Sequence, residues 1–263
     1  LSGAPTPSTS SAGTTNYYVA QNATLTDCEG PKTTITVTVS GTPVAPTVSD
    51  VSYCNNETAT ALTATASTGN TLVWYDASQT GITTPTPSTS SVGSVTYYVA
   101  QQTASGCEGP KSLVTVTINA LPVAPTATTA IAYCKDATAT ALTATASGSH
   151  TLVWYDTDGT TVLSGAPTPS TSSVGTTTYY VAQNNTLTSC EGPQTTITIT
   201  VNALPVAPTA TTTIDYCEDD AAVALSATAS SGHTLVWYGS DGTTVLSGAP
   251  TPSTSSAGTT NYY

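Results

Sequence analysis

Residues 71–76 read TLVWYD, and the same phrase returns as TLVWYD at 151–156 and as TLVWYG at 234–239. In an extended chain successive side chains point to opposite faces, so the leucine and tryptophan share one face while the valine and tyrosine share the other. Because β-branched and aromatic residues favour strands, we predict a strand whose tryptophan fills a core and whose tyrosine points away from it. The tryptophans are Trp74, Trp154 and Trp237, and the outward tyrosines are Tyr75, Tyr155 and Tyr238.

The tryptophans also set the period of the chain, because they are spaced by 80 and then by 83 residues. The pairs YY and YC and the phrase CEGP recur at similar intervals, and the eighteen residues LSGAPTPSTSSAGTTNYY stand both at 1–18 and at 246–263. The sequence is therefore a tandem array with a period of about 82 residues. We divide it into repeat 1 (1–42, the back of a repeat), the complete repeats 2 (43–120) and 3 (121–203), and repeat 4 (204–263, the front of a repeat).

Each repeat has the pattern of an all-β domain. ATALTATAS alternates apolar with small or polar residues, and TTTYYVAQ and TTITITVNA are rich in β-branched and aromatic residues, which is typical of strands. Phrases such as DTDGT and SGAPTPSTSS supply the turns, and no stretch has helical periodicity with caps. About seven short strands in about 80 residues predict an immunoglobulin-like β-sandwich. Proline-rich joints such as NALPVAPTATT are short and stiff, so we expect the sandwiches to form a linear array.

The charge balance excludes several classes of partner. The 263 residues contain 3 Lys+Arg against 15 Asp+Glu, which gives a net charge of −12. Nucleic-acid binding needs clustered lysine and arginine to neutralise phosphates, and attraction to an anionic membrane surface needs them too. The sequence has no apolar run near the 18 or so residues that cross a bilayer. We therefore expect neither nucleic-acid binding nor membrane insertion.

Catalytic and metal sites find little support in the sequence. No Ser/His/Asp set, paired-carboxylate pocket or phosphate loop recurs from repeat to repeat, so we expect no enzyme activity and no cofactor. Aspartates such as Asp76, Asp158 and Asp241 follow the WY pair, where aspartate is an ordinary turn residue. Calcium needs several oxygen ligands at short spacing, and these turns do not offer them, so we predict no metal site.

The order YC…ATALTATAS…TLVWYD…TTTYYVAQ…CEGP…TTITITV resembles the Ig-like repeats of giant cell-surface proteins of Bacteroidota, including adhesins of the gliding-motility type. The resemblance covers nearly the whole chain. It implies export by type IX secretion, an extracellular place on the cell surface, and a role as a repeated stalk or adhesin segment. Members of that group differ in what they bind, so the resemblance assigns no binding residue.

Six cysteines in such an extracellular repeat suggest disulfides. Three of them end the YC pair (Cys54, Cys134 and Cys217), and three begin CEGP (Cys28, Cys107 and Cys190). Repeat logic pairs Cys54 with Cys107 and Cys134 with Cys190, which leaves Cys28 and Cys217 to partners beyond these residues. Geometry raises an objection, because an eight-residue strand spans about 26 Å while the Cα atoms of a disulfide lie within about 7 Å.

Two other pairings answer that objection. In a linear array the bottom of one domain meets the top of the next, which would bring Cys54 of repeat 2 to Cys190 of repeat 3. Pairing across each linker would instead use all six cysteines, as Cys28–Cys54, Cys107–Cys134 and Cys190–Cys217. The sequence leaves these alternatives open, with free thiols as the remaining one.

Two functions from different classes follow. The first is a structural stalk or filament segment of a repetitive surface adhesin, whose partners are neighbouring repeats and other copies in a filament. The second is a multivalent carbohydrate-binding module, in which the outward tyrosines stack on surface polysaccharide and weak sites add by avidity. Repeats 1 and 4 each lack strands that the other has. We favour their completion within a longer polypeptide, and strand donation between copies is the alternative.

Overall fold

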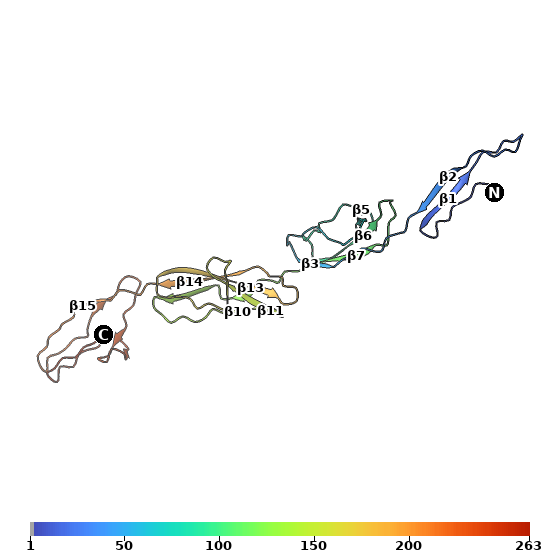
Figure 1. Ribbon diagram of the computed structural model, residues 1–263. Helices are drawn as coiled ribbons and strands as arrows, with labels where there is room; N and C mark the ends of the chain where they lie inside the picture. The colour runs from blue at the N-terminus through green and yellow to red at the C-terminus, as the bar shows by residue number, and fades with distance from the viewer. Residues whose placement is uncertain (1–2) are drawn as a thin grey trace.

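The computed structural model describes residues 3–263 and shows an elongated row of β units (Figure 1). Repeat 1 forms a hairpin at one end of the row, repeats 2 and 3 follow, and repeat 4 lies at the far end. The two chain termini therefore stand at opposite ends of the molecule. Within residues 3–263, no helix is long and apolar enough to cross a membrane.

Repeats 2 and 3 share one architecture, a five-stranded sheet faced by an irregular second layer. In repeat 2 the sheet has the order β3-β7-β6-β4-β5, and in repeat 3 it has the order β12-β11-β13-β14-β9. Neighbouring strands in both sheets are antiparallel, with one exception in each. β3 pairs with β7 in parallel in repeat 2, and β9 pairs with β14 in parallel in repeat 3. The strands of repeat 2 are β3 (Val51–Cys54), β4 (Thr71–Tyr75), β5 (Gly81–Ile82), β6 (Gly93–Gln102) and β7 (Ser112–Asn119). Those of repeat 3 are β8 (Thr126–Ala127), β9 (Ala130–Cys134), β10 (Ala144–Thr145), β11 (His150–Tyr155), β12 (Val162–Leu163), β13 (Gly175–Asn185) and β14 (Thr195–Asn202).

Each complete repeat has its own core, built by the alternation of its strands. Along β14 every second residue is buried, so Ile197, Ile199 and Val201 face inward between threonines. Trp154 on β11 is 6% exposed and packs in the same cluster, and Trp74 on β4 is 3% exposed in the matching cluster of repeat 2. The tryptophan phrase that sets the period therefore also supplies the largest core side chain of both complete repeats.

The second layer departs from the sequence-based expectation. ATALTATAS predicts a full strand, but in repeat 3 only Ala144–Thr145 forms a ladder (β10 with β8), and in repeat 2 the contact is one bridge between Thr47 and Thr65. The facing segments are rich in proline, which has no N–H to donate and so interrupts a ladder. Single bonds remain, such as that from Leu142 N to Pro167 O at 2.9 Å.

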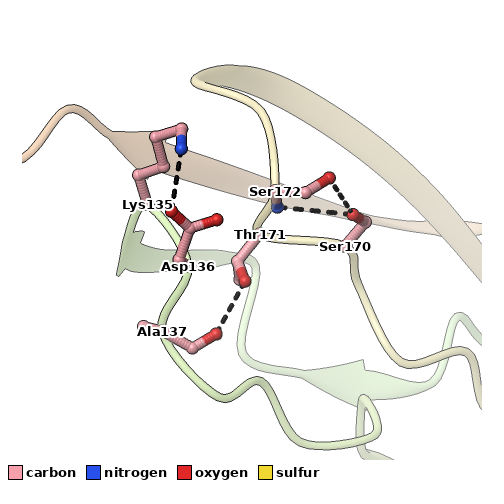
Figure 2. A network of polar contacts seen from close by, with 6 residues as sticks. All are labelled: Lys135, Asp136, Ala137, Ser170, Thr171 and Ser172. Carbon is pink, nitrogen blue, oxygen red and sulfur yellow. Dashed lines mark hydrogen bonds and ion pairs between the residues drawn. The ribbon is translucent and has the colours of Figure 1, made fainter.

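Side chains replace the missing ladder in this layer. Thr171 Oγ1 donates to Ala137 O at 2.6 Å (Figure 2), and the backbone N–H of Asp136 donates to Thr171 O at 2.9 Å. Asp136 has φ of 62°, in the left-handed region that aspartate and asparagine tolerate best among residues with a side chain. The same threonine bond recurs as Thr89 to Glu57 O and as Thr254 to Asp220 O. The layer is thus held by the same bonds in repeats 2, 3 and 4.

Repeats 1 and 4 hold complementary parts of this architecture. Repeat 1 is the hairpin of β1 (Gly13–Val19) and β2 (Thr33–Val39), whereas repeat 4 contains only two short strand pairs. They are β15 (Thr209–Ala210) with β16 (Ala227–Thr228), and β17 (Trp237–Tyr238) with β18 (Val245–Leu246). Trp237 is only half-buried, unlike its two equivalents, because residues 204–263 form no strand equivalent to β13 or β14.

Candidate functional site

The most distinctive chemistry in the structure is a disulfide between repeats. Cys54, the last residue of β3, is bonded to Cys190, which lies in the CEGP loop after β13, with the two Cα atoms 5.5 Å apart. Cys54 stands opposite Asn119, the final residue of β7, so it lies at the end of repeat 2 that adjoins repeat 3. The CEGP loop lies at the other end of its own sheet. The bottom of one repeat therefore meets the top of the next, and the bond spans the joint.

This connectivity corrects two expectations. Pairing within repeats would join Cys54 to Cys107, but these residues lie at opposite ends of the sheet of repeat 2, separated by the length of its strands. Pairing across each linker would use Cys190 with Cys217, and Cys190 is already bonded to Cys54. Within residues 3–263 the other four cysteines carry free thiols, namely Cys28, Cys107, Cys134 and Cys217.

A glycine allows the linker to pass close to the CEGP loop at the same joint. A Cβ built on Gly192 would lie 2.3 Å from Pro122 O, and one built on Gly109 would lie 2.2 Å from Pro43 O. Real Cβ atoms do not approach backbone that closely, and backbone cannot give way as a flexible side chain can. The glycine of CEGP is therefore required by close approach of the linker rather than by a special φ.

We expect Gly192→Ala to destabilise repeat 3 by about 1–3 kcal/mol, since the added methyl overpacks a backbone contact. Gly165→Ala is the matched control, because nothing lies within 4 Å of its Cβ position, and a change there should stay within about 0.5 kcal/mol. Urea unfolding of both variants measures the difference. Equal midpoints for the two variants would show that the linker moves aside without cost.

A buried glutamine fastens the linker to the sheet. Gln183 on β13 is fully buried, and its Nε2 donates to Val123 O in the linker at 2.5 Å while its Oε1 accepts from Ser147 N at 2.7 Å. Gln101 repeats both bonds in repeat 2, to Val44 O and from Ser67 N. Sequence reasoning missed this residue. The available signal was the polar glutamine that ends the apolar phrase YVAQ in repeats 1, 2 and 3.

The tyrosines of the WY pair are not left exposed, as the carbohydrate-binding alternative would require. They do point away from the tryptophan core, but Tyr155 is only 7% exposed and its hydroxyl donates to Glu191 Oε1 at 2.5 Å. Tyr75 makes the same bond to Glu108, and Lys111 Nζ lies 3.4 Å from the centroid of its ring. The CEGP loop folds over this face of the sheet. Its glutamate accepts the hydrogen bond of the tyrosine hydroxyl, and in repeat 2 the lysine that follows CEGP lies over the tyrosine ring. Tyr238 is half-buried in repeat 4.

Burial raises the pKa of Tyr155 from 10.0 to about 12, helped by the bond to Glu191 and by the charge of that carboxylate. A raised pKa means that the folded state holds the neutral phenol, so this contribution to stability is full below pH 10 and is lost as the pH rises toward 12. We expect the urea midpoint of repeat 3 to fall across this range, and to fall less in Tyr155→Phe. Tyr18→Phe, at an exposed tyrosine of repeat 1, is the control, and its urea midpoint should fall with pH as much as that of the unsubstituted chain.

In the turns after WY, the aspartate carboxylates accept hydrogen bonds from groups of the same turn. Asp158 accepts from the N–H groups of Thr160 and Thr161, both at 2.8 Å, and from the Thr161 hydroxyl at 2.6 Å. These bonds hold the pKa of Asp158 well below its usual range, and the same bonds act on Asp241. Among the described residues no group of three or more His, Cys, Asp or Glu side chains is placed to hold a metal ion. The turn geometry explains these aspartates without one.

Comparison with solved structures returns tandem β-sandwich proteins. The fibronectin(III)-like modules of Clostridium thermocellum CbhA are 15% identical, with 60% of this chain and 92% of that chain covered at a TM-score of 0.33. An I-band fragment of titin is 14% identical, with coverage of 75% and 76% and a TM-score of 0.30. The FN1–FN3 domains of chicken CNTN1 are 15% identical, with coverage of 71% and 77% and a TM-score of 0.30. Likenesses this distant carry no argument about function.

The family comparison is more specific. No curated protein matches the chain. The family model described as "Ig-like domain CHU_C associated" matches residues 43–120 and again 122–203, which together are more than half of the sequence. Both matched stretches contain the five-stranded sheet, the buried tryptophan and the CEGP loop. The chain therefore belongs to the CHU_C-associated Ig-like domain family and is built of tandem repeats of that domain.

Proposed function

We propose that this chain is a structural stalk segment of an extracellular, repetitive surface adhesin, in which each repeat adds length and the joints resist bending. The observation that carries the proposal is the disulfide between Cys54 and Cys190, because it ties one repeat to the next rather than closing a single domain. Disulfides persist in oxidising surroundings outside the cytosol, which supports an extracellular place. The elongated row of units in Figure 1 supports a role in extension.

Surface chemistry supports the same role. A net charge of −12 with only 3 Lys+Arg makes neighbouring chains repel one another and offers few cleavage sites to trypsin-like proteases. The tyrosines that a sugar-binding module would use are engaged by Glu108 and Glu191, so no specific observation favours the carbohydrate-binding alternative. Neighbouring repeats of the same array are the partners that the joint contacts support.

The test is electron microscopy of the native protein on its cells, labelled with an antibody raised against repeat 3. Long thin labelled filaments are expected. Label confined to a compact layer, or label that follows bound polysaccharide and disappears when the polysaccharide is removed, would contradict the stalk. Solution scattering of the purified chain supplies a second measure, and a compact particle there would contradict the proposal as well.

A further inference from the structure

A proline-rich segment in the second layer of each complete repeat turns alternate side chains toward solvent. It reads TPTPSTS at 84–90 in repeat 2 and APTPSTS at 166–172 in repeat 3. In repeat 2 the side chains of Pro85, Pro87 and Thr89 are buried. The side chains between and after the prolines are exposed in both repeats, namely Thr86, Ser88 and Ser90, and Thr168, Ser170 and Ser172. We call these six residues the outer hydroxyl row.

The inward and outward hydroxyls of this segment have different partners. Thr171 Oγ1 donates to Ala137 O and so holds the layer on the repeat (Figure 2). Ser170 and Ser172 instead bond to each other, with 3.0 Å between their Oγ atoms (Figure 2). Ser88 and Ser90 form the same pair in repeat 2, also at 3.0 Å. A group attached to the outer hydroxyl row would therefore leave the bonds that hold the layer intact.

The backbone of the segment is extended and lies outside every strand of residues 3–263. A residue that precedes proline is restricted to extended conformations, so Thr86 and Thr168 are held in them by the proline that follows each. An enzyme that modifies peptides can bind such a preordered chain at low cost in conformational entropy. Threonines of the sheet differ, because Thr198 on β14 lies in a backbone that is already paired with a strand on each side.

The surroundings of the row lack the charges that keep most protein surfaces hydrated. Only 7% of the residues of the chain are charged, compared with about 25% in a typical soluble domain. Neither segment contains a charged residue, and the valines that follow them, Val92 and Val174, are 58% and 54% exposed. Stalk segments rich in serine, threonine and proline are typical carriers of O-linked sugars. A sugar on Ser90 or Ser172 would hydrate this side of the repeat and cover the neighbouring valine.

We propose that the outer hydroxyl row is a site of O-glycosylation in repeats 2 and 3. The proposal rests on the extracellular place argued above, because a sugar coat serves a chain that stands outside the cell. In the transfer step, a serine or threonine hydroxyl oxygen bonds to the anomeric carbon of a sugar carried by a nucleotide- or lipid-linked phosphate donor. The bond between that carbon and the donor phosphate breaks, and its electron pair leaves with the phosphate. The hydroxyl proton passes to a base of the glycosyltransferase, and nothing is oxidised or reduced.

The first measurement compares the protein purified from its own cells with the same chain produced in a host that does not glycosylate proteins. Pepsin peptides that contain 84–90 and 166–172 should carry the added mass of hexose or amino sugar in the native protein only. Fragmentation that preserves the sugar should place it on the outer hydroxyl row, with Thr89, Thr171 and the sheet threonines unmodified. Native peptides without added mass, phosphate in place of sugar, or sugar spread equally over the sheet threonines would overturn the proposal.

Variants expressed in the native cells test the placement. The triple variant Thr168→Val/Ser170→Ala/Ser172→Ala should lose the sugar of repeat 3 and keep that of repeat 2, which serves as an internal control. Thr196→Val, at an exposed threonine of β14, is the matched control and should keep both.

Sugar that persists on the repeat 3 peptide of the triple variant would overturn the assignment to the outer hydroxyl row. The outcome is separable from that of the stalk function. Long filaments on cells without any sugar would overturn the glycosylation alone, whereas a glycosylated chain confined to a compact layer would contradict the stalk alone.

Discussion

Pulling the chain by its two ends should reveal roughly 450–490 Å of hidden length when the disulfide between repeats is reduced. The bond joins Cys54 to Cys190 across 136 residues, and force applied at the termini passes through the sulfur atoms rather than through the chain between them. An unfolded residue contributes at most about 3.3–3.6 Å, which gives the expected difference in fully extended length. Single-molecule force spectroscopy with and without reductant measures it directly.

The double variant Cys54→Ser/Cys190→Ser is the control for the pulling experiment. Without reductant it should already show the full length, and reductant should change nothing. Pairing within repeats would instead hide two shorter segments, between Cys54 and Cys107 and between Cys134 and Cys190, and would give two smaller steps. Observation of those two steps would contradict the staple between repeats.

Truncation of the core tryptophan of repeat 3 should lower the stability of the chain more than the glycine and tyrosine substitutions do. Trp154 is 6% exposed and packs against the buried residues Leu142, Val181, Ile197 and Ile199. Trp154→Ala leaves a cavity among them, and changes of this kind cost about 3–5 kcal/mol. Hydrogen exchange of the β14 amides, followed by mass spectrometry, reports this loss for repeat 3 alone.

Trp237→Ala is the matched comparison, because the same residue in repeat 4 is only half-buried. It should leave the exchange of β14 unchanged and should alter the unfolding of the whole chain by less than Trp154→Ala does. Equal destabilisation by the two substitutions would contradict the claim that the burial of Trp154 stabilises the core of repeat 3.

The sequence predicts the period, the sheet strands and the sandwich class because these depend on local patterns. TLVWYD, TTTYYVAQ and TTITITVNA are rich in β-branched and aromatic residues, and they form β11, β13 and β14 as expected. ATALTATAS alternates apolar with small or polar residues but forms only β10, since a ladder also needs a partner with N–H groups and the facing segments are rich in proline. The residue pattern of a segment indicates whether that segment can be a strand, whereas the formation of a ladder depends on the partner segment as well.

The candidate site was harder to predict, because it depends on how repeats meet. The sequence offers the bond between Cys54 and Cys190 as one of several pairings, and the choice among them depends on the places of Cys54 at the bottom of one sheet and of Cys190 at the top of the next. The burial of Tyr155 depends on the path of the CEGP loop, which brings Glu191 over the sheet face. Gln183 could have been noticed as a polar residue that recurs after YVA, but its partners in the linker could not.

Peptide mapping of the oxidised chain under non-reducing conditions tests the central claim most directly. Digestion with pepsin at acidic pH suits a chain with only 3 Lys+Arg and suppresses thiol exchange, because thiolates are scarce there. The account predicts a linked peptide that joins Cys54 to Cys190. A peptide that joins Cys54 to Cys107, together with one that joins Cys134 to Cys190, would contradict it, since the repeats would then be closed one by one and the joints would carry no covalent bond.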